Sequence, residues 1–308
     1  MENRQTNLAS VNTGTIFVII AAFGFSAKAI FIKLAYGLGN NIDPVTIMAL
    51  RMSMALPFFI VAAVIASRMD DIEPLTRRDH VALVGMGFLG YYLSSFLDFS
   101  GLVYISAGLE RVILYLYPTL VVVMTAIHKR NRIKGNTIVA LLFCYMGVGL
   151  VFISQVNLQS SALLLGASLV AAATVCFSVF SVIANGMIHR IGAVRFTAYS
   201  MSVACLLTVL HFSTTHSMQL NNLPSDIYLF GAILAIGSTV IPGFMMSEGI
   251  KRIGADNAAI ISSVGPIATI ALAALLLGES VTVTQIAGTM LVLAGVYQVN
   301  NQQRKLNA

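Results

Sequence analysis

The strongest constraint on this chain is a succession of apolar runs, each about as long as a helix that crosses the ~30 Å hydrocarbon core of a bilayer. Charged residues make up 10% of the 308 residues, against roughly 25% in soluble domains. Strands of a membrane barrel would give a weaker, alternating pattern. The sequence therefore predicts an all-α membrane protein with ten transmembrane helices. We place these spans at residues 15–36, 44–67, 80–99, 107–127, 136–154, 163–187, 194–214, 226–249, 257–277 and 283–299.

The cations between these runs predict an orientation. Fourteen of the 18 Lys and Arg residues lie in the two tails and in every second connection, or at the adjoining ends of the spans. The alternate connections contain none; they are residues 37–43, 100–106, 155–162, 215–225 and 278–282. Short loops rich in Lys and Arg stay in the cytoplasm, so both termini are predicted to be cytoplasmic. The pI of 9.3 then reflects membrane orientation and does not indicate nucleic-acid binding.

The chain also contains an internal repeat. A shift of 148 residues aligns Gly101 with Gly249 and Pro118 with Pro266, and a shift of 152 aligns Gly14 with Gly166. Glycine and proline matches carry weight because these residues fix backbone geometry. Each copy holds five spans, an odd number, so the second copy enters the membrane from the opposite side. We predict two inverted repeats at 14–155 and 162–300 with short tails at 1–13 and 301–308; such repeats recur in secondary transporters. Duplication that serves only to build a stable bundle is the alternative.

Particular segments add a family resemblance. They are DPVTIMALR, GLVYISAGLERVILYLYP, GIKRIGADNAAIISSVGP and LLLGESVTVTQIAGTMLVLAGVY. Between about residues 14 and 299 the chain resembles the EamA-like branch of the drug/metabolite transporter superfamily. The resemblance implies a small-metabolite carrier of a bacterial inner membrane, often an exporter, with a cavity lined by helices one, three, four, six, eight and nine. One departure is Arg130-Asn131, which stands where the second repeat has Gly278-Glu279.

Polar residues inside the spans are the candidates for a binding site. Helical spacing puts Ser178, Ser181 and Asn185 on one face of span six, and Tyr91, Ser94 and Asp98 on one face of span three. The repeat carries the span-six face to Ser26 and Lys33 in span one, and Ser263 offers a weak hydrogen-bonding group in span nine. In span four, Glu110 lies over Tyr117 and Arg111 over Tyr115. These positions, with substrate as the expected ligand, form the predicted site. Lys33 could instead extend to the outer surface, and headgroups could anchor the tyrosines.

The charged residues among these candidates are predicted to lie at a similar depth in the outer half of the membrane. An ionised side chain at the bilayer centre costs roughly 2.5–3.5 kcal/mol, so Asp98 and Glu110 are expected to neutralise Lys33, Arg51 and Arg111. This network either closes a gate or holds spans together, or it binds cargo with Arg111 or Lys33 as a carboxylate anchor. Lys28 points about 200° away from Ser26 and is expected to pair with an acid of a neighbouring helix. Pro242-Gly243 predict a bend in span eight, and Glu279 is expected to hydrogen-bond at a helix terminus.

The sequence favours a carrier over two other classes. An enzyme lacks support because the five histidines are scattered at span ends, and no metal or cofactor motif occurs. A channel would show a row of charges or a filter sequence. No ATP-binding motif is present, so a gradient must supply the energy, with protons as the candidate coupling ion. The expected cargo is an amino-acid-like metabolite, exported; an organic anion or nucleotide-like metabolite is the alternative. A monomer or weak homodimer in the bacterial inner membrane is expected.

Overall fold

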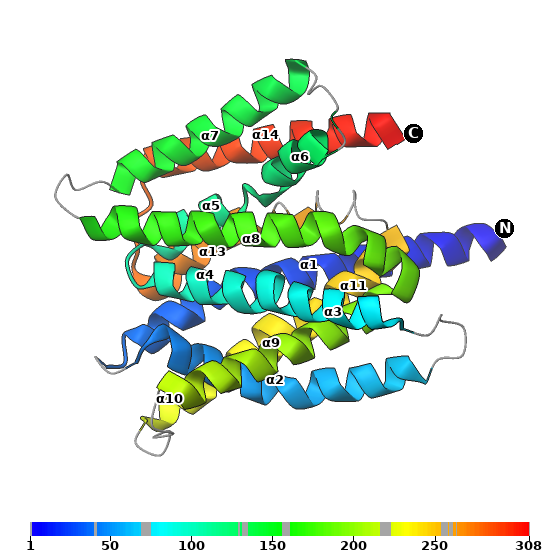
Figure 1. The fold of residues 1–308 in the computed structure, drawn as a ribbon. Helices are drawn as coiled ribbons and strands as arrows, with labels where there is room; N and C mark the ends of the chain where they lie inside the picture. The colour runs from blue at the N-terminus through cyan, green and yellow to red at the C-terminus, as the bar shows by residue number, and fades with distance from the viewer. Residues whose placement is uncertain are drawn as a thin grey trace. The chain divides into compact units, whose positions relative to one another are not determined.

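A computed structural model of the protein describes residues 2–39, 42–68, 75–128, 130, 135–155, 161–215, 223–253, 258, 261–262 and 264–307. All secondary structure in these residues is helical, so the fold is all-α (Figure 1). The α-helices are α1 (Glu2–Tyr36), α2 (Pro44–Ser67), α3 (Arg77–Met86), α4 (Ser94–Leu102), α5 (Ala107–Leu114), α6 (Tyr117–His128), α7 (Gly135–Gln155), α8 (Ser161–Ile191), α9 (Ala193–Thr215), α10 (Ser225–Ala235), α11 (Ile241–Ile253), α13 (Val264–Leu272) and α14 (Val283–Asn307). Three π-helical segments interrupt them: η1 (Gly87–Leu93), η3 (Ile236–Val240) and η4 (Ala273–Leu277).

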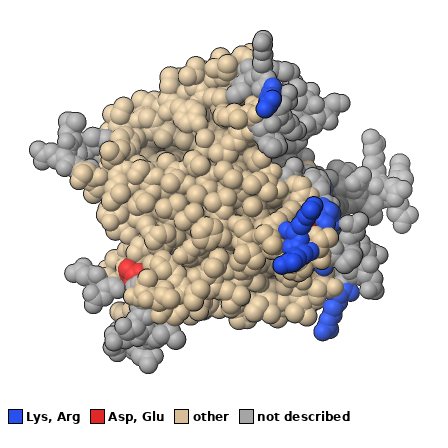
Figure 2. Space-filling model, in the orientation of Figure 1, with Lys and Arg blue, Asp and Glu red and all other residues tan. Residues whose placement is uncertain are grey.

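Within the part of the chain that the structure describes, eight helical segments are long and apolar enough to cross a membrane. They are Asn12–Tyr36, Pro44–Ser67, Arg77–Leu102, Ala107–Ile127, Gly135–Ile153, Ser161–Ile188, Ala193–Thr215 and Ser225–Ile253. Two shorter apolar helices, Val264–Leu277 and Val283–Gln298, follow them. Many of the exposed side chains on these helices are aliphatic, such as Val61 and Leu210, and Figure 2 shows one face on which almost all of the described surface is uncharged. The molecule is therefore an α-helical membrane protein.

Local sequence signals explain where several helices begin. Asp43 caps α2 by accepting hydrogen bonds from the backbone N–H groups of Val45 (2.8 Å) and Thr46 (3.2 Å). Pro44 follows at the first helical position, where its missing N–H costs nothing. At the start of α3, Thr76 and Asp79 form a reciprocal capping box. These caps fix the first turns of two spans.

The chain forms two compact units, and both halves of the sequence contribute to each. The first unit comprises Met1–Ile30, Ala107–Gln159 and Ile241–Ala308, and the second comprises Phe31–Ser106 and Ser160–Val240. In the first unit α7 runs along α14, and α13 packs on α5 (Figure 1). In the second unit α2 packs along α9, and α4 along α8. Each unit therefore pairs helices that are far apart in the sequence.

Glycines allow the closest of these helix contacts in the first unit. A Cβ atom on Gly147 of α7 would lie 2.4 Å from the carbonyl oxygen of Gly288 and 2.8 Å from Val292, both on α14. A Cβ atom on Gly295 would lie 2.6 Å from the carbonyl oxygen of Ala140 and 2.4 Å from Cys144 Sγ. A side chain at either glycine would force the helices apart, as expected where small residues pack membrane helices. The second contact is the first one with every residue displaced by 148 positions.

A second pair of contacts corresponds in the same way. In the second unit, a Cβ atom on Gly101 would lie 2.8 Å from the carbonyl oxygen of Gly166 and 2.5 Å from Val170. In the first unit, a Cβ atom on Gly249 would lie 3.2 Å from the carbonyl oxygen of Gly14 and 2.5 Å from Val18. Offsets of 148 and 152 residues relate the two sets. Equivalent residues of the two sequence halves thus make equivalent contacts.

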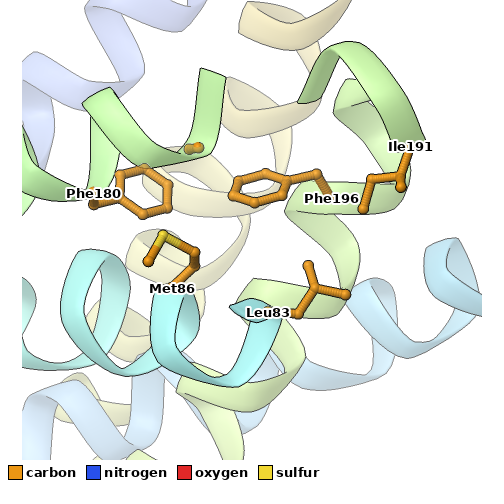
Figure 3. Packing of buried hydrophobic residues seen from close by; sticks show 6 residues of the cluster. Leu83, Met86, Phe180, Ile191 and Phe196 are labelled. Atoms are coloured by element: carbon orange, nitrogen blue, oxygen red, sulfur yellow. The ribbon is translucent and has the colours of Figure 1, made fainter. Parts of the chain in front are cut away.

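An aromatic core joins α3, α8 and α9 in the second unit. Leu83, Met86, Phe180, Ile191 and Phe196 are buried together (Figure 3). The rings of Phe180 and Phe196 have centroids 5.8 Å apart. A Cβ atom on Gly90 of η1 would lie only 2.2 Å from the Phe180 ring, so this glycine lets the π-helical backbone press directly on the core.

Two of the π-helical segments occupy related positions. Shifting η3 back by 148 residues places it at 88–92, inside η1. Pro242 follows η3 closely, in the first turn of α11. Span eight is thus interrupted by a π turn immediately before the proline at which the sequence predicts a bend. π turns within α-helices are frequent at functional sites.

Candidate functional site

Ser26, Arg111 and Gly265 lie together in the first unit. The Ser26 hydroxyl is within hydrogen-bond distance of two carbonyl oxygens, of Ala22 on its own helix (2.6 Å) and of Gly265 (3.0 Å). A Cβ atom on Gly265 would lie 3.0 Å from Arg111 Nη2 and 3.4 Å from Ser26 Oγ. The absence of a side chain at Gly265 therefore leaves room for the guanidinium. Thr269, one turn further along α13, donates to the Ser26 carbonyl oxygen at 3.3 Å.

Lys28 and Glu110, which are close to Ser26 and Arg111 in the sequence, form an ion pair with 3.8 Å between Lys28 Nζ and Glu110 Oε1. The Glu110 side chain is fully buried, and that of Lys28 is 15% exposed. The pair joins α1 to α5, and Arg111 is the next residue of α5. Opposite charges at this distance neutralise each other, so Arg111 gives the group an excess of positive charge.

Arg111 has the chemistry to receive an anionic group. Its Nε atom has no hydrogen-bond partner within the described part of the chain. A guanidinium presents several donors in a plane that matches a carboxylate. Arg111 also acts electrostatically on Tyr117, while Tyr115 is buried. The first unit therefore assembles Ser26, Lys28, Glu110, Arg111 and Tyr117 from helices that are well separated in the sequence.

Lys33 lies in the second unit and contacts backbone carbonyls. Its Nζ donates to the carbonyl oxygens of Leu102 (3.3 Å) and Ile105 (2.7 Å). These oxygens lie at and just beyond the C-terminal end of α4, where a cation is favourable. Near the end of α1, the Tyr36 hydroxyl donates to the Phe99 carbonyl oxygen at 2.8 Å. The end of α1 is thus tied to the end of α4.

Arg51 and Asp98 are both buried in the second unit. Arg51 Nε donates to Thr239 Oγ1 at 2.7 Å, and its guanidinium carbon lies 5.3 Å from the centroid of the Phe99 ring. Asp98 is 2% exposed and interacts electrostatically with Arg51. We call Lys28, Glu110 and Arg111 of the first unit the first charged group, and Lys33, Arg51 and Asp98 of the second unit the second charged group.

The remaining predicted site residues take part in helix packing. Tyr91 packs edge-on against Phe180, with ring centroids 4.9 Å apart. Ser94 donates to the Ala173 carbonyl oxygen at 3.1 Å, which links α4 to α8. Ser178 and Ser181 donate to carbonyls of their own helix, at 2.6 Å and 2.8 Å.

Three further predictions concern individual positions. The side chain of Asn185 and all of Ser263 lie outside what the structure describes. A Cβ atom on Gly243 of α11 would meet no described atom within 4 Å, so packing among the described residues does not require a glycine there. Pro242 precedes it and is buried. Neither residue forms part of the two charged groups.

Glu279 supports the first group from a distant part of the sequence. Its carboxylate accepts hydrogen bonds from the backbone N–H groups of Ala107 (3.0 Å) and Gly108 (3.4 Å). These are the first residues of α5, the helix that carries Glu110 and Arg111. A carboxylate at a helix N-terminus satisfies free donors and complements the helix dipole. The structure places the expected hydrogen bonds of Glu279 at a helix terminus, but sequence reasoning did not identify which helix it caps.

Thr239 and Thr269 were also missed as site residues. A polar residue inside an apolar run is the available signal, and both threonines carry it. Thr239 contacts Arg51 of α2, and Thr269 contacts Ser26 of α1. The spacing of residues within their own spans does not predict these contacts. Within the described residues, no group of three or more His, Cys, Asp or Glu side chains is arranged to hold a metal ion.

Comparison with known proteins identifies the family. The model of the EamA-like transporter family matches residues 12–153 and again residues 164–301. The chain belongs to the EamA-like transporter family. The double match covers nearly the whole chain, and the resemblance seen in the sequence is confirmed.

Relatives and a solved structure agree with this assignment. This EamA-like protein is 32% identical to the uncharacterized transporter YcbK of Bacillus subtilis, over 92% of this chain and 91% of that one. It is 25% identical to an uncharacterized transporter of Archaeoglobus fulgidus, over 84% and 89% of the two chains. A crystal structure with 18% sequence identity superimposes with a TM-score of 0.65, covering 96% of this chain and 99% of the other. That likeness concerns the fold.

Proposed function

We propose that this EamA-like protein is a secondary transporter that exports a small, amino-acid-like metabolite across a bacterial inner membrane by alternating access. The observation that carries the proposal is the guanidinium of Arg111 in the space left by Gly265, together with the ion pair of Lys28 with the buried Glu110, the residue that precedes Arg111 on α5. Placing three ionised groups in spans is expensive in a membrane. We infer that these charges recognise the cargo, since charged residues inside membrane spans mark substrate and ion pathways.

Ten membrane crossings, arranged as two inverted five-helix repeats with both termini in the cytoplasm, form the architecture we propose. The two family matches support the repeat. So do the packing contacts, because the contact made by Gly147 is equivalent to that made by Gly295, and the contact made by Gly101 is equivalent to that made by Gly249. The two shorter apolar helices would supply the ninth and tenth crossings. In transporters built this way the cargo site lies near the bilayer midplane.

An amino-acid-like cargo fits both charges of the group. Its carboxylate would bind Arg111, whose Nε has no partner in the described residues. Its ammonium would approach Glu110 and compete with Lys28, because the 3.8 Å separation between Lys28 and Glu110 is longer than a hydrogen bond. We propose protons as the coupling ion. We propose a monomer or weak homodimer as the oligomeric state.

An organic anion or nucleotide-like metabolite is the second candidate. The group contains two bases, Lys28 and Arg111, and one acid, Glu110, which favours a cargo of net negative charge. A zwitterion and an anion differ in their need for Glu110. Transport of the anion should survive Glu110→Gln, whereas transport of the zwitterion should be lost.

The cargo class can be tested directly. Purified protein is screened by thermal shift against the amino acids, small organic acids and nucleoside monophosphates, and stabilising compounds are then tested for counterflow in proteoliposomes. We expect saturable counterflow of a zwitterionic compound. Conversion of a compound to a product without movement across the membrane would instead indicate an enzyme, and non-saturable flux would indicate a channel.

Arg111→Ala tests the anchor. We expect transport of the identified compound to fall to background while the variant remains folded in the membrane. Arg252→Ala is the matched control, because Arg252 forms a partly exposed ion pair with Glu248 on its own helix. Normal transport by the Arg111→Ala variant would remove this residue from the site.

A further inference from the structure

Span eight contains a π-helical segment, η3, whose geometry is reinforced by a side chain. Thr239 donates its hydroxyl hydrogen to the carbonyl oxygen of Leu234, five residues earlier, at 2.8 Å. The buried hydroxyl of Thr208, by contrast, reaches back only four residues, to the carbonyl oxygen of Ala204 at 2.8 Å. The Thr239 hydrogen bond therefore matches the i→i+5 register of a π-helix and not the i→i+4 register of an α-helix.

Arg51 of α2 holds this hydroxyl in place. Because the Thr239 hydrogen is directed at Leu234, the hydroxyl oxygen is available as an acceptor, and Arg51 Nε donates to it at 2.7 Å. A hydrogen bond from an ionised donor is roughly twice as strong as a neutral one. Leu234, Thr239 and Arg51 thus form a short chain of hydrogen bonds that ends on a carbonyl of the turn preceding η3.

The position of Arg51 is itself constrained. The residue is 7% exposed, its guanidinium lies over the Phe99 ring, and Asp98 acts on it electrostatically. The cation–π contact and the nearby carboxylate offset part of the cost of burying a cation. These neighbours hold the guanidinium in place, so its hydrogen bond to Thr239 is a fixed feature of the second unit.

The related segment η1 is held in a different way. A shift of 148 residues carries Thr239 to Tyr91, and a shift of 152 carries Arg51 to Val203. Tyr91 packs on Phe180, and Val203 contacts η1 where a Cβ atom on Gly87 would lie 2.8 Å from it. Tight packing therefore supports η1 at the positions where a charged donor and a hydroxyl support η3.

Proline explains why η3 needs this support. Pro242 follows η3 and has no N–H, and its ring would clash with the carbonyl of Ser238, four residues earlier, in an unbroken α-helix. Gly243 follows with open space around its Cβ position among the described residues, which leaves the backbone free to adjust. Backbone hydrogen bonding after η3 therefore lacks the donor that any other residue would supply at position 242.

We propose that Arg51 is a positioning residue that holds span eight in its π register through Thr239, and that loss of this hydrogen bond loosens the backbone hydrogen bonding of η3 and the turn before it. This proposal rests on the contacts of Arg51 and Thr239 and is independent of the cargo that the protein transports.

Hydrogen–deuterium exchange of the full-length purified protein tests the proposal without a known cargo. Thr239→Val keeps the shape of the side chain and removes both hydrogen bonds. We expect amide exchange in peptides covering residues 234–243 to rise at least about tenfold in Thr239→Val and in Arg51→Gln, which is roughly 1.4 kcal/mol of lost protection. Thr239→Ser, which retains the hydroxyl, should exchange at the wild-type rate. Thr208→Val is the matched control, since it removes an ordinary i→i+4 hydrogen bond from α9.

The double variant separates a specific hydrogen bond from general destabilisation. If Arg51 acts through Thr239, the Arg51→Gln/Thr239→Val protein should exchange no faster over residues 234–243 than the faster single variant. Wild-type exchange in Thr239→Val, multiplied effects in the double variant, or the same rise in Thr208→Val would each overturn the proposal. If Arg51→Gln does not fold, Thr239→Val with its two threonine controls still decides the question.

Discussion

The cations Lys28, Lys33, Arg51 and Arg111 each lie against specific residues of their own unit. Lys28 pairs with Glu110, Lys33 with carbonyls at the end of α4, and Arg51 with Thr239, while Arg111 lies against Gly265. The membrane explains this, because a charge in hydrocarbon cannot rely on water to offset its desolvation. At the scale of single residues, a charged side chain within a membrane span therefore needs neighbouring groups that offset its desolvation.

Breaking the Lys28–Glu110 pair should be more harmful than removing it. Glu110→Gln leaves the Lys28 ammonium without its counter-charge, and we expect the free energy of unfolding to fall by about 3 kcal/mol. Lys28→Met/Glu110→Gln removes both charges and should recover most of that loss. Thermal unfolding of the purified variants in one detergent measures both effects.

The control for this prediction is Glu248→Gln. Glu248 and Arg252 form a partly exposed i,i+4 pair, and such pairs contribute roughly 0.3–0.5 kcal/mol. A double variant less stable than Glu110→Gln alone would contradict a pairwise role for Lys28.

At the scale of helices, contacts through glycine decide how closely spans approach. Gly147 and Gly149 belong to the same helix, α7, but a Cβ atom would meet a described neighbour only at Gly147. We expect Gly147→Ala to destabilise the protein by roughly 1–3 kcal/mol, because its methyl group would meet the Gly288 carbonyl at 2.4 Å. Gly149→Ala should be neutral or stabilising by about 0.5–1 kcal/mol. Thermal unfolding should separate the two variants, and equal melting temperatures would argue against the α7–α14 contact.

The Glu279 cap should stabilise the start of α5. We expect Glu279→Ala to cost about 1 kcal/mol of stability and to speed amide exchange at Ala107 and Gly108, whose N–H groups lose their acceptor. Glu279→Gln retains one carbonyl acceptor and should have a smaller effect. Exchange at the start of α2, which Asp43 caps independently, provides the internal control. Unchanged exchange at Ala107 in the alanine variant would show that this cap is not formed in the membrane protein.

At the scale of the whole molecule, the inverted repeat predicts a topology. Five spans in each proposed repeat would put residue 160 on the membrane face opposite to the N-terminus, and the distribution of Lys and Arg predicts that the N-terminus is cytoplasmic. Reporter fusions active on only one side of the membrane, joined after residue 160 and at the C-terminus, should give opposite signals. The same signal from both fusions would contradict five spans per repeat.

The sequence anticipated much of this architecture. Apolar runs predicted the helices, and the offsets of 148 and 152 residues identified glycines that make equivalent contacts. Helical spacing also grouped Tyr91, Ser94 and Asp98, but it did not show that Tyr91 packs on Phe180 or that Ser94 bonds to α8. Spacing fixes which residues share a face of a helix, whereas the neighbour of that face depends on how the helix is rotated and packed.

The sequence by itself determined that this is a helical membrane protein with two related halves, because runs of apolar residues and their periodic repetition are properties of the chain. Only the tertiary structure decided which charges meet. Asp98 and Glu110 were expected to neutralise Lys33, Arg51 and Arg111; in the structure Asp98 lies near Arg51 in the second unit, and Glu110 pairs with Lys28 in the first. Depth along a helix follows from residue number, but an ion pair also requires two helices to turn the right faces toward each other, and side-chain packing sets that rotation.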